Sequence, residues 1–427
     1  MKLSISSIVL ALSFASTGVF GSPVPTTSRQ MGSAARGKTV AGAAYLITNE
    51  PSGNQIIAAD INSDGTLTLR RAIDAGGIGA HGIPDANGPD PLFSQGAIKA
   101  SAAGNIVAAV NSGSNTLSVF GINPTDATNL QMIGQPVGSN GQFPMSLAIN
   151  KAGNMVCALN GGEINGVSCF KVDKTAGLVP IANTVRSLNL NQTTPATGPA
   201  GTASHVVFSE DNSQLIASVK GVPPTPGFLA VWDVAADGSL SQDFQSIAPA
   251  SGGLLPFSMT IIDGQNAILA TDAGLGFDIF DLAAASNATI ARRASTTGDR
   301  SSANAISGQS ATCWSSFSPK TGNFFLTDIG TATITEVNVD ANLKGTIVKQ
   351  YPQAAGSGTI DNDVATVGKN DFLYVLAANA SSIDVLALPA PGKAKNIQKV
   401  DIAGPAKAAG IKVSAFNLQG MTTFIRK

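Results

Sequence analysis

The chain has 427 residues, of which 43% are apolar, so it can bury a large core in one repeat domain or in two to three ordinary domains. Its formal net charge is only −1 and its Lys and Arg residues are scattered, which excludes the basic stripe that binds nucleic acid. No nucleic-acid partner is therefore expected. Charged residues make up 12% of the chain and glycines number 46, above the usual share of about 7%, a composition that favours an extracellular all-β protein.

The N-terminus predicts secretion. Lys2 is followed by an apolar run from Ile8 to Ala15 and by small residues up to Gly21, a pattern typical of a cleaved signal peptide over residues 1–21. The run is too short to span a bilayer about 30 Å thick, so no transmembrane segment is expected. Residues 22–42 are polar and aperiodic and predict a flexible leader or propeptide, followed by a single domain over residues 43–427. The mature protein is expected to be extracellular or associated with the cell wall.

Two further features become informative if the chain is secreted. The sequons NQT, NAT and NAS predict glycosylation at Asn191, Asn287 and Asn379. Cys157 and Cys169 lie in two adjacent predicted strands, MVCALN and VSCFKV, which a tight connection joins. If these strands form a hairpin, the two cysteines face each other, and we expect a disulfide between them. Cys313 is then expected to be a free, buried thiol.

One sequence unit recurs seven times along the chain, every roughly 50 to 60 residues, as expected of propeller blades. Each unit has an apolar strand that ends in a polar residue, a Gly/Ser-rich turn and a second alternating strand. The first of these strands end at Asn49, Asn111, Asn160, Lys220, Asp272, Asp328 and Asn379.

A further strand precedes the apolar strand in six of the seven units, and a fourth strand usually follows a turn such as SDG or ADG. The repeat therefore predicts an all-β fold, a seven-bladed β-propeller of four-stranded blades. The first unit, starting at AAYLITN, lacks its inner strand, and the chain ends with a spare segment, AGIKVSAF. We expect this C-terminal segment to complete blade one, which leaves no open sheet edge and favours a monomer.

Several segments resemble the lactonase-like propeller family, which includes propeller-type 6-phosphogluconolactonases and the fungal 3-carboxymuconate lactonising enzymes. They are SQGAIKASAAGNIVAAVNSGSNTLSVF, FPMSLAINKAGNMVCALNGG, SHVVFSEDNSQL, ATCWSSFSPKTGNFFLTDIGTATIT and DNDVATVGKNDFLYVLAANASSIDVL. The resemblance covers nearly all of residues 43–415 and implies the seven-bladed fold. It implies activity less directly, since one fold hosts many functions.

The chain departs from the pattern that the resemblance implies for catalysis. The catalytic branches of the family carry an Arg-His pair at the start of one inner strand and a Glu at the end of the next strand. Here the matching strand is ASHVVF, so His205 is kept but Ser204 replaces the arginine, and the glutamate position falls on Val219 or Lys220. A proton-transferring carboxylate and its cationic companion are both missing.

Propeller geometry predicts where a site would form. Inner strands begin, and the strands after them end, on the same face of the disk, so both sets of residues converge around the channel mouth. We expect a funnel for a small polar or acidic ligand there, with His205 as the catalytic candidate and with these binding candidates: Gln95, Asn111, Asn160, Lys220, Asp272, Trp314, Asp328 and Asp363.

Each of these candidates also has a structural interpretation. Asn and Asp at strand ends commonly hydrogen-bond the backbone of the following turn. His205 can be a hydrogen-bonded core histidine, and Trp314 can be a core residue rather than a ligand-stacking one.

Two functions therefore stay open. The first is a secreted or wall-associated propeller without the family's catalytic pair, which binds a small molecule, a glycan or a protein through its faces. The second is an extracellular lactone hydrolase or cycloisomerase that uses a site around His205. The chain has two histidines far apart, no CxxC pair and no phosphate-binding loop, so no metal and no cofactor are expected.

Overall fold

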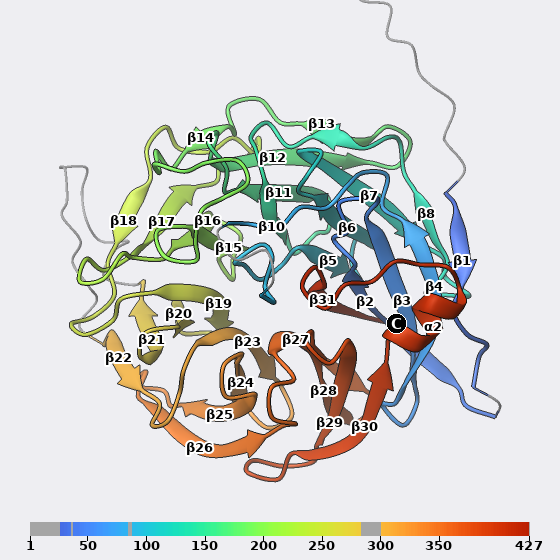
Figure 1. Cartoon of the computed structure of the whole chain (residues 1–427). Coiled ribbons are helices and arrows are strands. Elements are labelled where there is room, and N and C mark those ends of the chain that lie inside the picture. Colours follow the sequence, from blue (N-terminus) through green and yellow to red (C-terminus); the bar gives the residue numbers. More distant parts are fainter. Residues whose placement is uncertain (1–25, 36, 84–87, 283–299, 427) are drawn as a thin grey trace, which may run out of the picture.

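Seven antiparallel sheets stand around a central axis, as the sevenfold repeat predicts (Figure 1). The structure is a computed structural model that describes residues 26–35, 37–83, 88–282 and 300–426. The predicted signal peptide and the sequon at Asn287 lie outside the described residues. Within the described residues the only assigned helix is the short α2 (Ala403–Ala408), so the predicted all-β propeller is confirmed.

Every blade has four main strands, counted here from the channel outward; they are consecutive in the chain except in blade one, whose inner strand is the last one. The inner strands are β31 (Gln419–Ile425), β5 (Ile98–Ser101), β10 (Pro144–Ile149), β15 (Ala203–Phe208), β19 (Pro256–Ile262), β23 (Thr312–Ser318) and β27 (Thr359–Val367). The second strands are β2 (Val40–Ile47), β6 (Ile106–Asn111), β11 (Met155–Asn160), β16 (Gln214–Val219), β20 (Ala267–Asp272), β24 (Asn323–Asp328) and β28 (Asn370–Ala377).

The third strands are β3 (Gln55–Asn62), β7 (Thr116–Ile122), β12 (Gly166–Asp173), β17 (Phe228–Asp233), β21 (Gly276–Asp281), β25 (Thr333–Val339) and β29 (Ser382–Leu388). The outer strands are β4 (Leu67–Asp74), β8 (Leu130–Met132), β13 (Gly177–Pro180), β18 (Gln245–Ile247), β22 (Ser302–Ala305), β26 (Gly345–Pro352) and β30 (Lys395–Asp401). Three short strands add to the outer edges of blades one to three: β1 (Ser28–Gln30), β9 (Val137–Gly138) and β14 (Arg186–Ser187).

The core lies between the blades. Neighbouring blades pack face to face, so both faces of the central strands are covered, and β6, β11, β20 and β24 are buried over their whole length. This explains why these strands are nearly continuous apolar runs in the sequence, while the outer strands β26 and β30 carry many exposed residues. The inner strands contact one another in a closed ring, from β31 through β5 and onward to β27 and back.

Ring closure is confirmed, but the segment that closes the ring is not the one expected. The inner strand of blade one is β31, which pairs antiparallel with β2, with Ala44 opposite Thr423. The segment AGIKVSAF at residues 409–416 forms no strand. Its Ser414 carbonyl instead accepts a hydrogen bond from the Asn417 amide in a turn, so the chain reaches the inner edge only at Leu418.

Part of the segment expected to be a flexible leader is ordered. Strand β1 pairs with β4, with Ser28 opposite Ile73, and β2 already begins at Val40 rather than at residue 43. The Arg29 guanidinium donates hydrogen bonds to the carbonyls of Ala409 and Gly410, at 3.3 and 3.0 Å. The N-terminal segment therefore joins the outer edge of blade one to the turn after α2.

The predicted disulfide is present in the structure. Cys157 of β11 lies directly opposite Cys169 of β12, and the two are bonded. Cys313 is free and buried, as expected.

Replacing both bonded cysteines by serine should lower the free energy of unfolding by about 2–4 kcal/mol. The bond closes a loop over a sequence separation of 12 residues, and a cross-link of that length restricts the unfolded chain by about this amount. Urea denaturation of the double variant measures the loss. Non-reducing peptide mapping of the parent protein supplies the independent check, since free thiols at both positions would contradict the bond.

The described part of the chain contains no helix of the length and apolar character that a membrane span requires.

Candidate functional site

The structure defines two faces of the disk. On one face, here called the opening face, the inner strands begin and the second strands end, as the pairing of Ala203 with Val219 shows. On the other, here called the opposite face, the inner strands end, as at Ser101, which pairs with Ile106. Most of the candidates from the sequence lie at or next to strand ends on the opening face, whereas Asp363, expected at the start of its inner strand, is the fifth residue of β27 and pairs with Tyr374.

The Asn and Asp candidates at the strand ends are engaged in turns and loops. The Asp272 carboxylate accepts hydrogen bonds from the amides of Leu254, Leu255 and Gly274 at 2.6–3.0 Å. The Asp328 carboxylate accepts from the amides of Ser310, Gly330 and Thr331 at 2.7–3.0 Å.

The two amide candidates are used in the same way. The side chains of Asn111 and Asn160 donate to the carbonyls of Ala75 and Ser139, both at 3.2 Å, and both asparagines are buried. Together with the aspartates, these contacts support the interpretation that the strand-end residues serve the backbone.

The channel mouth at the opening face is filled by the chain itself. Residues 90–96, here called the plug segment, are all buried. The Gln95 side-chain amide donates to the carbonyls of Ser315 at 3.0 Å and Asn362 at 3.4 Å, and its oxygen accepts from the Ser315 amide at 3.2 Å. The Ser94 carbonyl accepts from the indole of Trp314 at 3.0 Å and from the amide of Gln419 at 2.8 Å. The plug segment is therefore bonded to the inner strands of blades six, seven and one.

A glycine allows the plug segment to approach the channel wall this closely. Gly96 has a φ of +91°, and a Cβ at this position would lie 2.9 Å from the Ser146 hydroxyl and 3.2 Å from Cδ2 of His205. Only glycine fits this backbone conformation and this spacing without strain. This accounts for the glycine in the SQGA segment.

Ser204 contacts Lys220, which with Val219 is one of the two residues on which the resemblance places the family's glutamate. Lys220 Nζ donates to the Ser204 hydroxyl at 2.7 Å, to the Phe93 carbonyl at 2.8 Å and to the Ala203 carbonyl at 3.3 Å. It also lies 4.4 Å from the centroid of the Phe257 ring, which favours a cation there. Lys220 is 3% exposed, and its ammonium connects blade four to the plug segment.

Asp90 supplies a negative charge near Lys220. Burial raises the pKa of the Asp90 carboxyl and lowers the pKa of the Lys220 ammonium, while each charge opposes the shift of the other. Asp90 also accepts a hydrogen bond from the Ser94 amide at 3.2 Å. Nothing in the sequence pattern indicates that Asp90 belongs to this cluster, because it ends a Gly/Pro-rich segment far from blade four in the sequence.

His205, the catalytic candidate, is enclosed. Its Nδ1 accepts a hydrogen bond from the Met259 amide at 3.0 Å, and its side chain is 2% exposed. Its Nε2 has no hydrogen-bond partner among the described residues. Burial, assisted by the charge of Lys99, lowers the pKa of His205 well below its usual range, so the imidazole is neutral at pH 7.

Two carboxyl groups at the channel wall hold the closing strand. Asp363, a binding candidate, accepts from the Thr423 amide and hydroxyl at 2.7 and 2.9 Å. Asp361 accepts from Gln419 Nε2 and the Gly420 amide, both at 2.8 Å. Burial raises the pKa of Asp363 and raises that of Asp361 to about 8. The sequence did not single out Asp361, because the strand it bonds was assigned to the wrong segment.

Trp314 belongs to the core, in agreement with its structural interpretation. It is fully buried, and its ring packs edge to face against Phe257 with centroids 5.1 Å apart. Among the described residues there is also no cluster of three or more His, Cys, Asp or Glu that could hold a metal ion.

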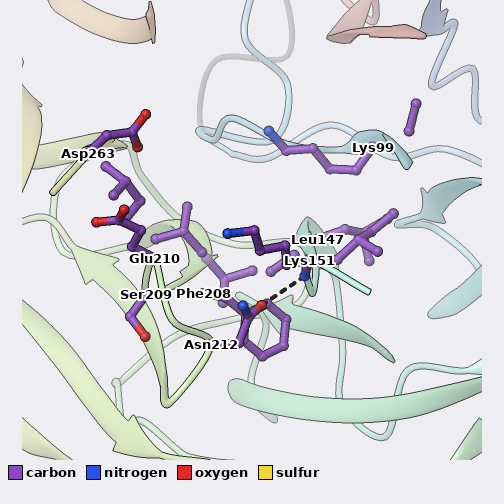
Figure 2. A pocket seen from close by; sticks show the side chains of 14 residues that line it. Lys99, Leu147, Lys151, Phe208, Ser209, Glu210, Asn212 and Asp263 are labelled. Carbon is purple, nitrogen blue, oxygen red and sulfur yellow. Dashed lines mark hydrogen bonds between the residues drawn. The ribbon is translucent and has the colours of Figure 1, made fainter. Parts of the chain in front are cut away.

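The opposite face contains a cavity, whereas the plug segment fills the channel mouth at the opening face. A cavity of about 500 Å³ lies at the ends of the inner strands of blades two to five (Figure 2). Four charged side chains line it: Lys99, Lys151, Glu210 and Asp263. Sequence reasoning missed this cavity, because it considered only the face at which the family's catalytic residues lie.

The comparisons with known proteins agree with the fold. The family model "Lactonase, 7-bladed beta-propeller" matches residues 40–194, and a search of curated proteins gives no match. Two solved structures have TM-scores of 0.60 at 16% identity and cover 90% of this chain: a candidate 6-phosphogluconolactonase of Bacteroides fragilis, 98% covered, and the periplasmic gluconolactonase PpgL of Pseudomonas aeruginosa, 100% covered. At such identities the likeness shows the fold alone. The resemblance to the lactonase-like seven-bladed propeller family is confirmed, in sequence over residues 40–194 and in fold around the whole ring.

Proposed function

We propose that this chain is a secreted lactonase-like propeller that binds ligands without hydrolysing lactones. One observation carries the proposal: Ser204, which replaces the arginine that the resemblance implies, is hydrogen-bonded at 2.7 Å to Lys220, which with Val219 is one of the two residues on which the glutamate position falls. The pair therefore stabilises the ring at the place where the resemblance implies acid–base chemistry.

The chemistry of the buried groups supports this proposal. A general base must be unprotonated and must reach a water or substrate proton within hydrogen-bond distance. All three protons of the Lys220 ammonium have acceptors within the protein: Phe93, Ala203 and Ser204. His205 is neutral but is 2% exposed, so a substrate at the opening face would not reach it while the plug segment stays in place.

A second candidate function is an extracellular lactone hydrolase or cycloisomerase. It is favoured by the free Nε2 of neutral His205 and by the lowered pKa of Lys220, since both are features of catalytic groups. This function requires the plug segment to leave the channel mouth during each turnover.

Hydrolysis of a panel of γ- and δ-lactones, including phosphogluconolactone and carboxymuconolactone, separates the two functions. We expect the purified protein and its His205→Ala variant to hydrolyse all of them at the rate of buffer alone. A known lactonase, assayed in parallel, shows that the panel reports activity. Turnover that disappears in His205→Ala would establish the second function, and turnover that survives the substitution would place catalysis elsewhere and also refute the proposal.

Secretion and glycosylation are part of the same proposal. The sequons at Asn191 and Asn379 are both exposed, as carbohydrate attachment requires. Peptide mapping of protein from the culture medium, before and after enzymatic removal of N-linked glycans, tests glycosylation at both sequons and identifies the mature N-terminus.

A further inference from the structure

In the cavity on the opposite face, the sign of each charged side chain depends on the blade that carries it. Lys99 is on β5 of blade two and Lys151 follows β10 of blade three, whereas Glu210 follows β15 of blade four and Asp263 follows β19 of blade five. Figure 2 shows the two carboxylates on one side of the cavity and the two ammonium groups extending toward them from the other. The cavity therefore has a positive side and a negative side.

These four charges do not neutralise one another directly. Within the described part of the chain, none of the four side chains forms an ion pair within 4.0 Å, although five other pairs do. Glu210 is held in position by the Gly264 amide, which donates to one carboxylate oxygen at 2.7 Å. The four charges are thus not paired with one another, and the cavity of about 500 Å³ that they line can admit a small charged ligand.

Apolar side chains form the rest of the lining. The partly exposed Ile149, Val207 and Ile261 come from the inner strands of blades three, four and five, next to the charged residues. Apolar walls with a few convergent polar groups are typical of small-molecule sites, and a low-dielectric wall strengthens the interaction of a ligand with the charges beside it.

From this arrangement we propose that the cavity on the opposite face binds a small zwitterion with an apolar substituent, of the α-amino acid class. Lys99 and Lys151 bind the carboxylate, Glu210 and Asp263 bind the ammonium group, and the apolar wall contacts the side chain. A simple anion would meet two carboxylates and a simple cation two ammonium groups, so only a zwitterion complements both sides. This assignment gives a ligand class to the binding role proposed above and rests on that role, but it uses a different face of the ring.

Isothermal titration calorimetry on the full-length mature protein, at pH 7 and low salt, tests the proposal. The probes are L-leucine and L-phenylalanine, together with 4-methylpentanoate and 3-methylbutylamine, which lack the ammonium and the carboxylate respectively. We expect at least one of the two amino acids to bind and the two single-charge analogues to bind at least tenfold more weakly than leucine. Lys99→Met and Asp263→Asn should each weaken amino acid binding at least tenfold.

The matched control is Lys395→Met, an exposed lysine on the outer strand of blade seven, which should leave the Kd unchanged. Thermal melting of each variant verifies that the protein is folded. The proposal fails if neither amino acid binds at millimolar concentration, if removing the ammonium or the carboxylate has no effect, or if the cavity variants bind like the parent. Lactone turnover is measured separately on the same preparation. If turnover is found, it refutes the non-hydrolytic role, but it does not affect the zwitterion site, which the calorimetry alone tests.

Discussion

A chain that ends at Asn417 is expected to lose cooperative folding. The deletion removes the buried Leu418 and β31, the inner strand of blade one, which buries Met421 and Phe424. Burying such a side chain contributes about 1.5–3 kcal/mol, so three of them contribute on the order of 5–9 kcal/mol. A typical domain is stable by only about 5–15 kcal/mol, and the deletion also leaves an open edge on β2.

The buried carboxyl groups beside β31 add to this loss. Asp361 and Asp363 accept four hydrogen bonds from β31, and the deletion leaves both without these donors in the channel wall. Leaving a buried acceptor unpaired costs about 1–3 kcal/mol. Far-UV circular dichroism during thermal melting measures the outcome, and a truncated chain that melts like the full one would refute closure by β31.

Point substitutions test whether the stability comes from the buried side chains of β31 or from the residues just before the strand. Met421→Ala should lower the free energy of unfolding by about 2–5 kcal/mol, because it leaves a cavity between the blades. Phe416→Ala is the matched control, since Phe416 lies just before the strand and is 37% exposed; its effect should stay within about 0.5 kcal/mol.

The fold was predictable from the sequence because each blade repeats the same local pattern. Alternating strands and Gly-rich turns recur at a regular spacing, and seven such units have one economical arrangement, a closed ring. The opposition of Cys157 and Cys169 followed from hairpin register alone. These inferences use residues that are close in the sequence.

The closing strand was assigned to the wrong segment because local pattern does not distinguish two apolar candidates near a terminus. AGIKVSAF alternates as a strand should, but its Ile411 and Val413 stay only partly buried. QGMTTFI contains Gly420 at a φ of +75° and fewer apolar residues, yet it is the segment that reaches the channel. The choice depends on where α2 and the following turn direct the chain, which is a tertiary property.

The sequence also does not predict which residues fill the channel mouth. Gln95, Lys220 and Trp314 were expected to surround an open channel mouth, but the sequence does not show that residues 90–96 enter the channel and form hydrogen bonds there. The contacts that decide this join residues more than 100 positions apart. The opposite-face cavity escaped notice for the same reason, because its four charges come from four blades.

The Lys220→Met variant is expected to be less stable than the parent by about 3 kcal/mol at pH 7. Methionine is unbranched like lysine but one atom shorter and donates no hydrogen bonds, so the carbonyl of Phe93 and the hydroxyl of Ser204 lose a partner while buried. Asp90 is then left in the core without the cation that opposes its raised pKa. Urea denaturation followed by far-UV circular dichroism measures the difference.

The pH dependence of the loss identifies Asp90 as its source. An acid whose pKa is raised by folding holds its proton more tightly in the folded state, so its contribution to stability is complete below the unfolded pKa of about 3.9 and is lost as the pH rises toward the folded pKa. Without Lys220 this loss is larger, and Lys220→Met should therefore fall further behind the parent between about pH 4 and pH 8.

Adding Asp90→Asn to Lys220→Met removes the titrating group and should abolish that slope. Asparagine tolerates the left-handed conformation of this residue, whose φ is +65°, so the backbone of the plug segment is kept. The double variant should also regain about 1–2 kcal/mol at pH 8, because it no longer buries an unpaired carboxylate. If its stability instead follows that of Lys220→Met at every pH, the charge of Asp90 plays no part in holding the plug segment, and the lysine acts through its hydrogen bonds alone.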